Sequence, residues 1–414
     1  MEGSIHSNRR ARVSIMLIMA VAALAACLVA LLWWQVKPAQ SATTIPNGFT
    51  DSLVAQLNKP TSMAVAPDGR LFVTQKASSN VGKVRVIKNG QLLSKLFLKL
   101  NTDTSLSRGL LGITLDPNFS SNHYVYIFYT ATSPTVHNRV SRFTASGDVA
   151  AAGSEKVIID LPNLGTSDGH YGSALRFGSD GKLYVGVGDD TTPDAAPSLG
   201  SLKGKILRLN SDGTIPSDNP FYGGTSTDDA IWALGLRQPY SLDVLSGTSP
   251  RMFLNDVGED SWEEIDEVAQ DPIQGAINYG WPDYEGFAPS PPSLQNYQDP
   301  LLAYPHPGIS PDPTVATGCA ITGGAFYDPA TARLPSQYQG KYFYADLCDG
   351  WIRSFDPATG TSSAFASGLV KPVDLEVGDN GSLYYLSYGS KSAAPASVHE
   401  IHYRPASSMI AHMR

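Results

Sequence analysis

One histidine stands in a setting that suits acid–base chemistry. His170 lies in the segment GTSDGHYGSALRFGSDGKLYVGVGDD, residues 165–190, and the strand expected after it ends at Asp189 and Asp190. A free imidazole has a pKa of about 6.5, so it can act as a base near neutral pH when a neighbour fixes its tautomer and stabilises its cation. A lone histidine in a glycine-rich loop is also typical of a surface side chain. The segment alone leaves both interpretations open.

The cysteines do not form a metal or haem motif. The chain has three of them, Cys27, Cys319 and Cys348, without any CxxC, CxxCH or paired Cys/His spacing. We expect a disulfide between Cys319 and Cys348, which an exported chain tolerates. The alternative is two buried free thiols.

Composition indicates a turn-rich β protein. The 414 residues include 38 glycines and 29 prolines, and only 16% of them are charged. The formal net charge of -8 argues against a nucleic-acid partner. At 42% hydrophobic residues, the chain is long enough to bury a large core.

The N-terminus has the pattern of a membrane or export segment. Arg9, Arg10 and Arg12 precede an uncharged run over residues 13–34, which is long enough to cross a bilayer as a helix. This charge distribution predicts that the rest of the chain lies outside the cytoplasm. A cleaved signal peptide and lipidation at Cys27 are the alternatives to an uncleaved anchor. The expected parts are a basic segment 1–12, an anchor or signal 13–34, a linker 35–45, a β domain 46–404 and a tail 405–414.

Three stretches of the β domain share one pattern. PDGRLFVTQ, SDGKLYVGVG and DNGSLYYLSYG each place an Asp-Gly or Asn-Gly turn before a strand of alternating residues. GKVRVIKNG, GKILRLNSDG and DGWIRSFDPATG are interpreted as outer strands of the same units. Repeated strand–turn units predict a β-propeller, although these repeats alone do not give the blade count and leave a pair of sandwiches open.

The segment PNGFTDSLVAQLNKP and the long proline-rich segment around His306 are expected to form loops at the rim of a pocket.

Eight segments together resemble the glucose/sorbosone dehydrogenase family. They occur in the family's order over residues 46–404: RGLLGITLDPNFSSNHYVYIFYT, NRVSRFTASG, GHYGSALRFGSDGKLYVGVGDD, GKILRLNSDGTIPSDNPF, IWALGLRQPYSLDV, FLNDVGEDSWEEIDEV, NYGWPDYEG and ITGGAFYDP. The resemblance implies an all-β fold, a six-bladed propeller of four-stranded antiparallel blades. It also implies pyrroloquinoline quinone (PQQ) with a calcium ion on one face of the propeller.

The resemblance assigns roles to three side chains. His170 matches the base that takes the proton of a sugar's anomeric hydroxyl, and Asp189 matches the carboxylate that orients it. Arg237 in GLRQPYSLDV matches an arginine over the cofactor, where a guanidinium stabilises developing negative charge. Gln238 and Tyr240 stand where enzymes of the family carry asparagine and glutamine. A structural ion pair is the alternative for Arg237.

The segment NDVGEDSWEEIDEV matches the loop that gives carbonyl oxygens to the cofactor's calcium. Gly258 and Glu259 are the expected calcium ligands, because calcium accepts main-chain carbonyls readily. The acidic residues that were candidates for further ligands are Asp256, Glu263, Glu264 and Asp266. A solvated acidic loop is the alternative.

The chain departs from the family at positions that bind the cofactor. PQQ is a tricarboxylate and needs cations or many donors around it. Cys348 stands where the enzymes carry a lysine, Lys371 and Val373 stand at an arginine pair, and Ser107 replaces a larger amide, with Arg108 beside it as a substitute. These changes are closer to the hedgehog-interacting-protein-like branch of the family.

Two functions from different classes follow. The first is an exported or membrane-anchored PQQ-dependent dehydrogenase that oxidises a small-molecule sugar, an aldose, to a lactone. Its electrons would pass to a quinone or a cytochrome, since the chain has no haem motif of its own. The second is a non-catalytic, calcium-stabilised propeller that binds carbohydrate or protein. A metal-dependent lactonase is a third candidate, which would need more carboxylates around one metal.

Overall fold

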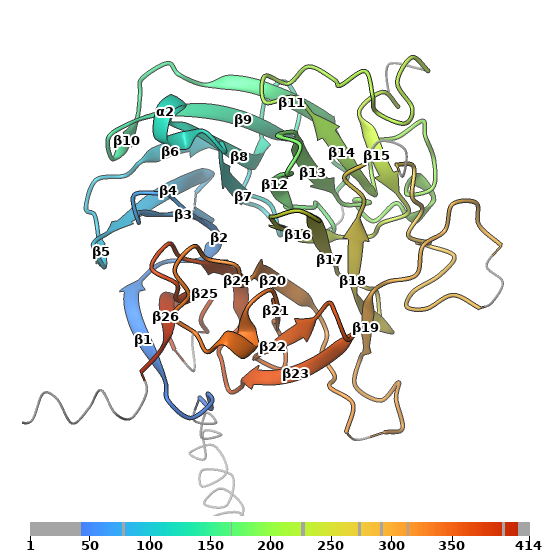
Figure 1. Cartoon of the computed structure of the whole chain (residues 1–414). Helices are drawn as coiled ribbons and strands as arrows, with labels where there is room; N and C mark the ends of the chain where they lie inside the picture. The colour runs from blue at the N-terminus through green and yellow to red at the C-terminus, as the bar shows by residue number, and fades with distance from the viewer. Residues whose placement is uncertain are drawn as a thin grey trace, which may run out of the picture. The chain divides into compact units, whose positions relative to one another are not determined.

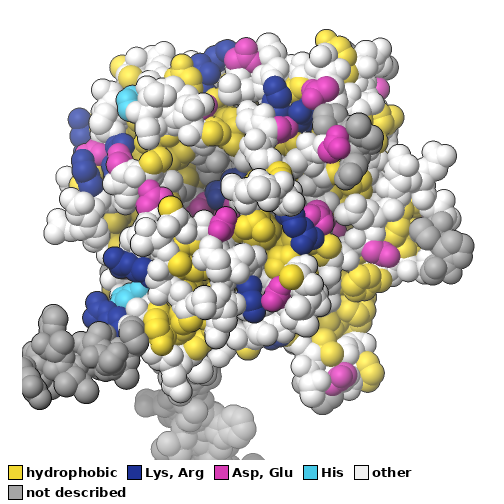
Figure 2. All heavy atoms as spheres, in the orientation of Figure 1, with side chains coloured by type: hydrophobic (Ala, Val, Ile, Leu, Met, Phe, Trp, Pro, Cys, Tyr) yellow, Lys and Arg dark blue, Asp and Glu magenta, His cyan; other side chains and the backbone are white. Residues whose placement is uncertain are grey.

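The computed structural model describes residues 43–76, 79–166, 168–224, 228–271, 275–289, 293–312, 314–390 and 394–404. The expected basic segment, the anchor or signal helix at 13–34 and the tail 405–414 lie outside the described residues. Within the described ranges, no helix is long and apolar enough to span a membrane. Figure 2 shows Lys and Arg side chains in small separate groups among acidic and uncharged residues on one face.

Six antiparallel sheets form the blades of a propeller, which confirms the expected fold (Figure 1). Blade 1 contains β2 (Pro60–Val65), β3 (Leu71–Lys76), β4 (Val81–Lys88), β5 (Gln91–Leu92) and β6 (Leu98–Asn101). Blade 2 contains β7 (Leu110–Leu115), β8 (Tyr124–Ala131), β9 (His137–Ser146), β10 (Val149–Ala150) and β11 (Lys156–Asn163). Blade 3 contains β12 (Leu175–Phe177), β13 (Leu183–Val187), β14 (Lys205–Leu209) and β15 (Ile231–Leu234).

The second half of the chain completes the ring. Blade 4 contains β16 (Pro239–Leu245), β17 (Arg251–Asp256), β18 (Trp262–Val268) and β19 (Leu302–Pro305). Blade 5 contains β20 (Ile321–Phe326), β21 (Tyr342–Asp346), β22 (Trp351–Asp356) and β23 (Thr361–Ala366). Blade 6 contains β24 (Pro372–Val377), β25 (Leu383–Ser387), β26 (Ser397–Tyr403) and β1 (Phe49–Gln56). The described helices are short: α2 (Phe119–Asn122), η1 (Pro193–Ala195) and η3 (Ser336–Tyr338).

The innermost strands touch in a closed order around the axis. Strands β2, β7, β12, β16, β20 and β24 each contact the next one, and β24 contacts β2 again (Figure 1). Apolar side chains fill the spaces between blades; for example, Phe72 and Val84 of blade 1 pack with Ile127 and Tyr129 of blade 2. The closed ring therefore holds the ends of the inner strands in fixed positions.

The repeated turns join the first strand of a blade to the second. Gly69, Gly181 and Gly381 have φ angles of 80°, 71° and 75° in the turns β2–β3, β12–β13 and β24–β25. Glycine takes this left-handed conformation without the steric cost of a Cβ atom. The predicted strands after these turns are β3, β13 and β25. The predicted outer strands are β4, β14 and β22, and each is the third strand from the propeller axis in its blade.

One expected rim loop is a strand instead. Residues 49–56 of the segment PNGFTDSLVAQLNKP form β1, which pairs with β26 and becomes the outermost strand of blade 6. Joining the start of the domain to its last blade closes the ring. The sequence prediction was wrong for these residues, because the strand has no Asp-Gly turn beside it and its partner lies at the other end of the chain. The end of the same segment, Pro60, does line the large cavity at the propeller face.

Candidate active site

An open cavity of about 520 Å³ lies at one end of the propeller axis, and side chains of all six blades line it. Its walls come from loops before innermost strands and from the ends of second strands. We call this cavity the basin. The expected site residues that line it are Ser107, His170, Arg237, Gln238, Tyr240, Gly258, Glu259 and Lys371. Lys76, Cys319, Val373 and Tyr388 also line it.

His170 and Asp189 form a hydrogen-bonded pair in the wall of the basin. His170 Nδ1 lies 2.7 Å from Asp189 Oδ1, and the aspartate side chain is fully buried. The same oxygen accepts the backbone N–H of Thr191 at 2.8 Å. A carboxylate only accepts hydrogen bonds, so this contact assigns the ring proton to Nδ1 and leaves the lone pair on Nε2. The pair therefore has the arrangement of an oriented general base.

Two glycines, Gly172 and Gly188, allow the backbone of the His170 loop to pack closely against the end of β13. A Cβ atom on Gly188 would lie 2.0 Å from the His170 carbonyl oxygen, and one on Gly172 would lie 2.3 Å from the Gly186 carbonyl oxygen. The Asp190 N–H donates to the His170 carbonyl at 3.0 Å. His170 itself has a φ of 54°, a left-handed conformation that costs a non-glycine residue energy. The close approach of these backbones brings the histidine to the aspartate.

Arg237 lies in the loop before β16. Its Nη1 donates to the carbonyl oxygens of Val257, at 3.0 Å, and Gly258. The backbone N–H groups of Arg237 and Gln238 donate to the buried carboxylate of Asp256 at 2.9 and 2.6 Å, and burial is the main reason that the pKa of Asp256 rises to about 7. The Asp189 N–H donates to the Arg237 carbonyl at 2.9 Å. The arginine and the histidine–aspartate pair thus lie on neighbouring, directly bonded loops.

The basin contains three cations that form no ion pair with the described residues: Lys76, Arg237 and Lys371. Lys76 donates to the Leu106 carbonyl, and burial lowers the pKa of its amine. Lys76 was not among the site residues predicted from the sequence. When the repeats are aligned on their turn glycines, Gly69 and Gly181, Lys76 falls at the position of Gly188, at the end of a second strand. In the third repeat the same position, seven residues after Gly381, is Tyr388, which lines the basin as Lys76 does.

Two expected cofactor residues do not line the basin. Arg108 is buried and bonded to Asp103 at 2.9 Å and to the Gly165 carbonyl, so its charge is neutralised away from the cavity. Cys348 is joined to Cys319 as a disulfide with Cα atoms 5.7 Å apart, and only Cys319 lines the basin. Neither Arg108 nor Cys348 therefore supplies a positive charge to the basin in place of the lysine and the arginine pair of the family's enzymes.

The candidate calcium loop reaches the basin through its main chain. Glu285 Oε1 accepts the backbone N–H groups of Glu259, Ser261 and Trp262 at 2.8, 3.1 and 3.0 Å, which fixes the loop that carries Gly258. The described residues contain no group of three or more His, Cys, Asp or Glu side chains arranged to hold a metal ion. A cation here would therefore depend on carbonyl oxygens and on oxygens of a bound ligand.

The nearby acidic side chains do not line the basin. Glu263 bonds to His306 Nε2 at 2.7 Å and to the Ile321 N–H at 2.9 Å, and Glu264 accepts the N–H of Gly286. Both oxygens of Asp266 are buried without a hydrogen-bond partner among the described residues. The expectation that these carboxylates add calcium ligands at the basin was wrong, because each is buried and none lines the basin.

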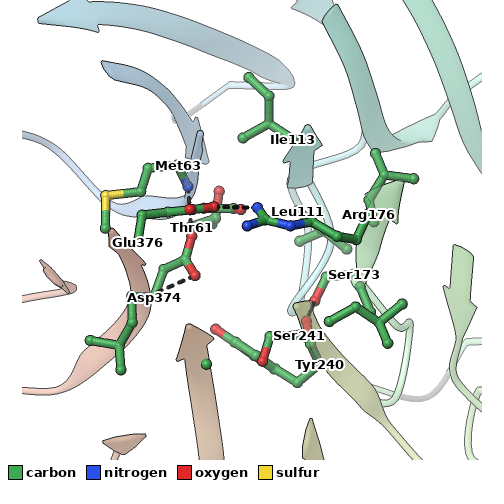
Figure 3. Close-up of a pocket in the computed structure, with 16 residues that line it drawn as sticks. Thr61, Met63, Leu111, Ile113, Ser173, Arg176, Tyr240, Ser241, Asp374 and Glu376 are labelled. Carbon is green, nitrogen blue, oxygen red and sulfur yellow. Dashed lines mark hydrogen bonds and ion pairs between the residues drawn. The ribbon is translucent and has the colours of Figure 1, made fainter. Parts of the chain in front are cut away.

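A second, smaller cavity of about 30 Å³ shares Thr61, Leu111, Ser173 and Tyr240 with the basin. Figure 3 shows the residues that line this smaller cavity. We call it the axial cavity; its charged residues come from innermost strands. Arg176 pairs there with Glu376 at 2.8 Å and with Asp243. Burial, followed by the charge of Glu376, raises the pKa of Asp374 to about 8. This cavity has room for about one water molecule.

The sequence matches one protein family over most of its length. A family model described as glucose/sorbosone dehydrogenase matches residues 57–393. Aldose sugar dehydrogenase YliI of Escherichia coli is 26% identical over 80% of this chain and 88% of its own. Quinoprotein glucose dehydrogenase B of Acinetobacter calcoaceticus is 28% identical over 60% of this chain and 56% of its own.

A relative of another kind and a solved structure also match. The HIPL2 protein of Arabidopsis thaliana is 34% identical over 50% of this chain, but the match spans only 33% of that protein. The PQQ-bound aldose sugar dehydrogenase of Streptomyces coelicolor has a TM-score of 0.62 at 21% identity, covering 87% of this chain and all of that one. The latter similarity concerns the fold.

Proposed function

We propose that this chain, which belongs to the glucose/sorbosone dehydrogenase family, is an exported or membrane-anchored enzyme that oxidises the C1 hydroxyl of an aldose to a lactone with bound PQQ. One observation carries the proposal: a single cavity combines a carboxylate-oriented imidazole with three cations that lack ion-pair partners. The imidazole suits the removal of a hydroxyl proton, and the cations suit a ligand with several carboxylates.

The basin fits the cofactor through its charge. Lys76, Arg237 and Lys371 would hold the three carboxylates and the quinone edge of PQQ, and Gln238 and Tyr240 would add polar contacts. When bound, PQQ supplies the acceptor for the hydride that leaves C1 of the sugar. Val373 and the Cys319 side of the disulfide provide an apolar wall in place of the missing family cations.

His170 would remove the proton of the sugar hydroxyl. Its Nε2 lone pair accepts the proton from O1 while C1 loses its hydride and the C1–O1 double bond forms. Asp189 stabilises the resulting imidazolium, because its carboxylate already accepts the hydrogen bond from Nδ1 at 2.7 Å. Arg237 would offset the negative charge that develops at the cofactor oxygens.

Calcium is proposed at the carbonyl oxygens of Gly258 and Glu259, which line the basin. These neutral oxygens suit calcium but give no net charge, and the Gly258 carbonyl already accepts a bond from Arg237. We therefore expect calcium to bind only when oxygen atoms of the cofactor complete its ligands, and to dissociate when the cofactor dissociates.

The uncharged N-terminal segment at 13–34 is proposed to export or anchor the domain outside the cytoplasm. A quinone or a cytochrome would then take the electrons. The export assignment rests on the sequence pattern of residues 13–34, and the assignment of the acceptor rests on the sequence having no haem motif.

The test is reconstitution of the full chain with PQQ and calcium, followed by dye reduction with a panel of aldoses. We expect sugar-dependent dye reduction that requires the cofactor. His170→Ala should lower turnover by about 10²-fold or more, the scale for loss of a positioned base. The matched control is His399→Ala, since His399 forms a similar pair with Asp51 at 2.9 Å in blade 6 and does not line the basin.

A non-catalytic binding propeller is the second candidate. It is favoured by Cys348, which forms a disulfide where the family's enzymes have a lysine. It is also favoured by the similarity to the hedgehog-interacting protein of Mus musculus, which is 28% identical over 45% of this chain and 30% of its own. Wild-type protein that neither binds PQQ nor reduces dye with any aldose would select this function over the dehydrogenase.

A further inference from the structure

A buried tryptophan connects the two parts of the candidate site. Trp281 lies in the connection between β18 and β19, is 8% exposed and does not line the basin. Its indole Nε1 donates to Asp189 Oδ2 at 2.9 Å, and its backbone N–H donates to the Gly235 carbonyl at 3.0 Å. Trp281 is therefore anchored to blade 3 while its side chain reaches the aspartate.

The two oxygens of Asp189 have different partners. Oδ1 accepts the bonds from His170 Nδ1 and the Thr191 N–H, whereas Oδ2 accepts the indole of Trp281. The carboxylate is fully buried, so loss of the indole donor would leave Oδ2 without this bond in a site closed to bulk water. The buried oxygen would then compete for other donors, and the carboxylate plane would no longer be fixed toward His170.

The ring of the same tryptophan faces Arg237. The guanidinium carbon lies 5.6 Å from the ring centroid, within the range of a cation–π contact. The Nε of Arg237 is buried without a hydrogen-bond partner among the described residues. The guanidinium is therefore held by the two carbonyl bonds of Nη1 and by the contact of its carbon with the Trp281 ring.

We propose that Trp281 is a positioning residue that fixes both the Asp189 carboxylate behind the base and the Arg237 guanidinium beside it. It touches neither substrate nor cofactor, and it acts through these two side chains. The inference rests on the proposed function only for its effect on turnover; the state of the His170 ring is a property of the protein without cofactor.

Trp281→Phe is the direct test, because phenylalanine keeps an aromatic ring under Arg237 and removes the N–H donor. The matched control is Trp232→Phe. The Trp232 indole donates to the Ala269 carbonyl at 2.7 Å, and Arg208 lies 4.6 Å from its ring centroid, so the control loses the same kind of donor elsewhere in the protein.

The first readout is NMR of full-length protein without cofactor, with ¹⁵N-labelled histidine. Wild type and Trp232→Phe should show the low-field proton of His170 Nδ1–H, and Trp281→Phe should lose that signal or broaden it. An unchanged signal in Trp281→Phe would overturn the inference, and this result does not depend on whether the protein is an enzyme.

The second readout is the kinetics of the reconstituted enzyme. Trp281→Phe should lower kcat by about tenfold, the lower range for a hydrogen bond to a charged group, and leave the KM for sugar within about twofold. Equal kcat values for wild type and Trp281→Phe would contradict the inference.

If Trp281→Phe does not fold, 3-benzothienylalanine at position 281 keeps the indole shape without the N–H, and the same NMR signal decides. Absence of activity in wild type would reject the proposed function and leave the NMR result standing.

Discussion

Two arginines near the propeller axis have opposite surroundings. Arg176 in the axial cavity pairs with two carboxylates, Asp243 and Glu376. Arg237 in the basin is held by two carbonyl oxygens and an aromatic ring, and has no ion pair among the described residues. Carbonyl groups fix the direction of a guanidinium without cancelling its charge, whereas carboxylates neutralise it. The difference indicates that Arg176 stabilises the ring of blades and that Arg237 is available to an anion.

The largest expected effect is on stability at the axial cavity. Arg176→Met would leave two buried carboxylates unpaired, so we expect the free energy of unfolding to fall by about 3–5 kcal/mol. Urea unfolding of the cofactor-free protein measures it. A loss below about 1 kcal/mol would remove the contrast between the two arginines.

The second effect is on activity in the basin. Arg237→Met should lower kcat/KM by about 10²-fold or more, because a positioned cation at a developing charge is lost. Its free energy of unfolding should change far less than that of Arg176→Met, since no buried carboxylate loses an ion pair. Steady-state dye reduction and urea unfolding of the same preparation check both parts; normal kcat/KM in this variant would contradict the role of Arg237.

The third effect is a pH dependence of stability at Asp374. Its pKa in the folded protein is raised to about 8, mainly by burial, so the folded state holds a proton there that the unfolded state releases near pH 4. This contribution to stability is complete below about pH 4 and is lost as the pH rises toward 8. Asp374→Asn should gain about 2 kcal/mol relative to wild type between pH 6 and pH 7.5. Parallel stability–pH curves for the two proteins would be the contrary result.

The smallest effect concerns cofactor affinity at Lys76. Lys76→Gln removes one of three basin cations and should weaken PQQ binding by about five- to tenfold, as expected for one charge-assisted contact. The variant should also show a weaker dependence of affinity on salt. Lys88→Gln is the control, because Lys88 pairs with Asp148 at 3.1 Å and does not line the basin. Equal losses in both variants would mean that the effect is not specific to the basin.

The fold could be read from the sequence where structure is local. The Asp-Gly and Asn-Gly turns located the second strands β3, β13 and β25, because a turn and the strand beside it are neighbours in the chain. The blade count came from the family resemblance. The closure of blade 6 by β1 was missed, since it pairs residues about 350 positions apart with no local signal.

The candidate site could also be predicted from the sequence only in part. The expectation for His170, Asp189 and Arg237 placed them together, and the structure joins their loops by hydrogen bonds. The sequence does not show which of the adjacent residues Ser107 and Arg108 faces the basin, so both were predicted to bind the cofactor. Only Ser107 lines the basin. Trp281 was visible only as part of a motif, because its contact with Asp189 depends on the packing of blade 4 against blade 3.

The most direct test of the account is equilibrium binding of PQQ to cofactor-free protein in the presence of calcium, for wild type, Arg237→Met and a variant of the axial cavity, Asp374→Asn, that leaves the three basin cations in place. We predict saturable binding at micromolar cofactor that weakens as salt increases, a marked loss of affinity in Arg237→Met and unchanged affinity in Asp374→Asn. Absence of binding in wild type, or equal affinity in all three proteins, would contradict the assignment of the basin's unpaired cations to an anionic cofactor.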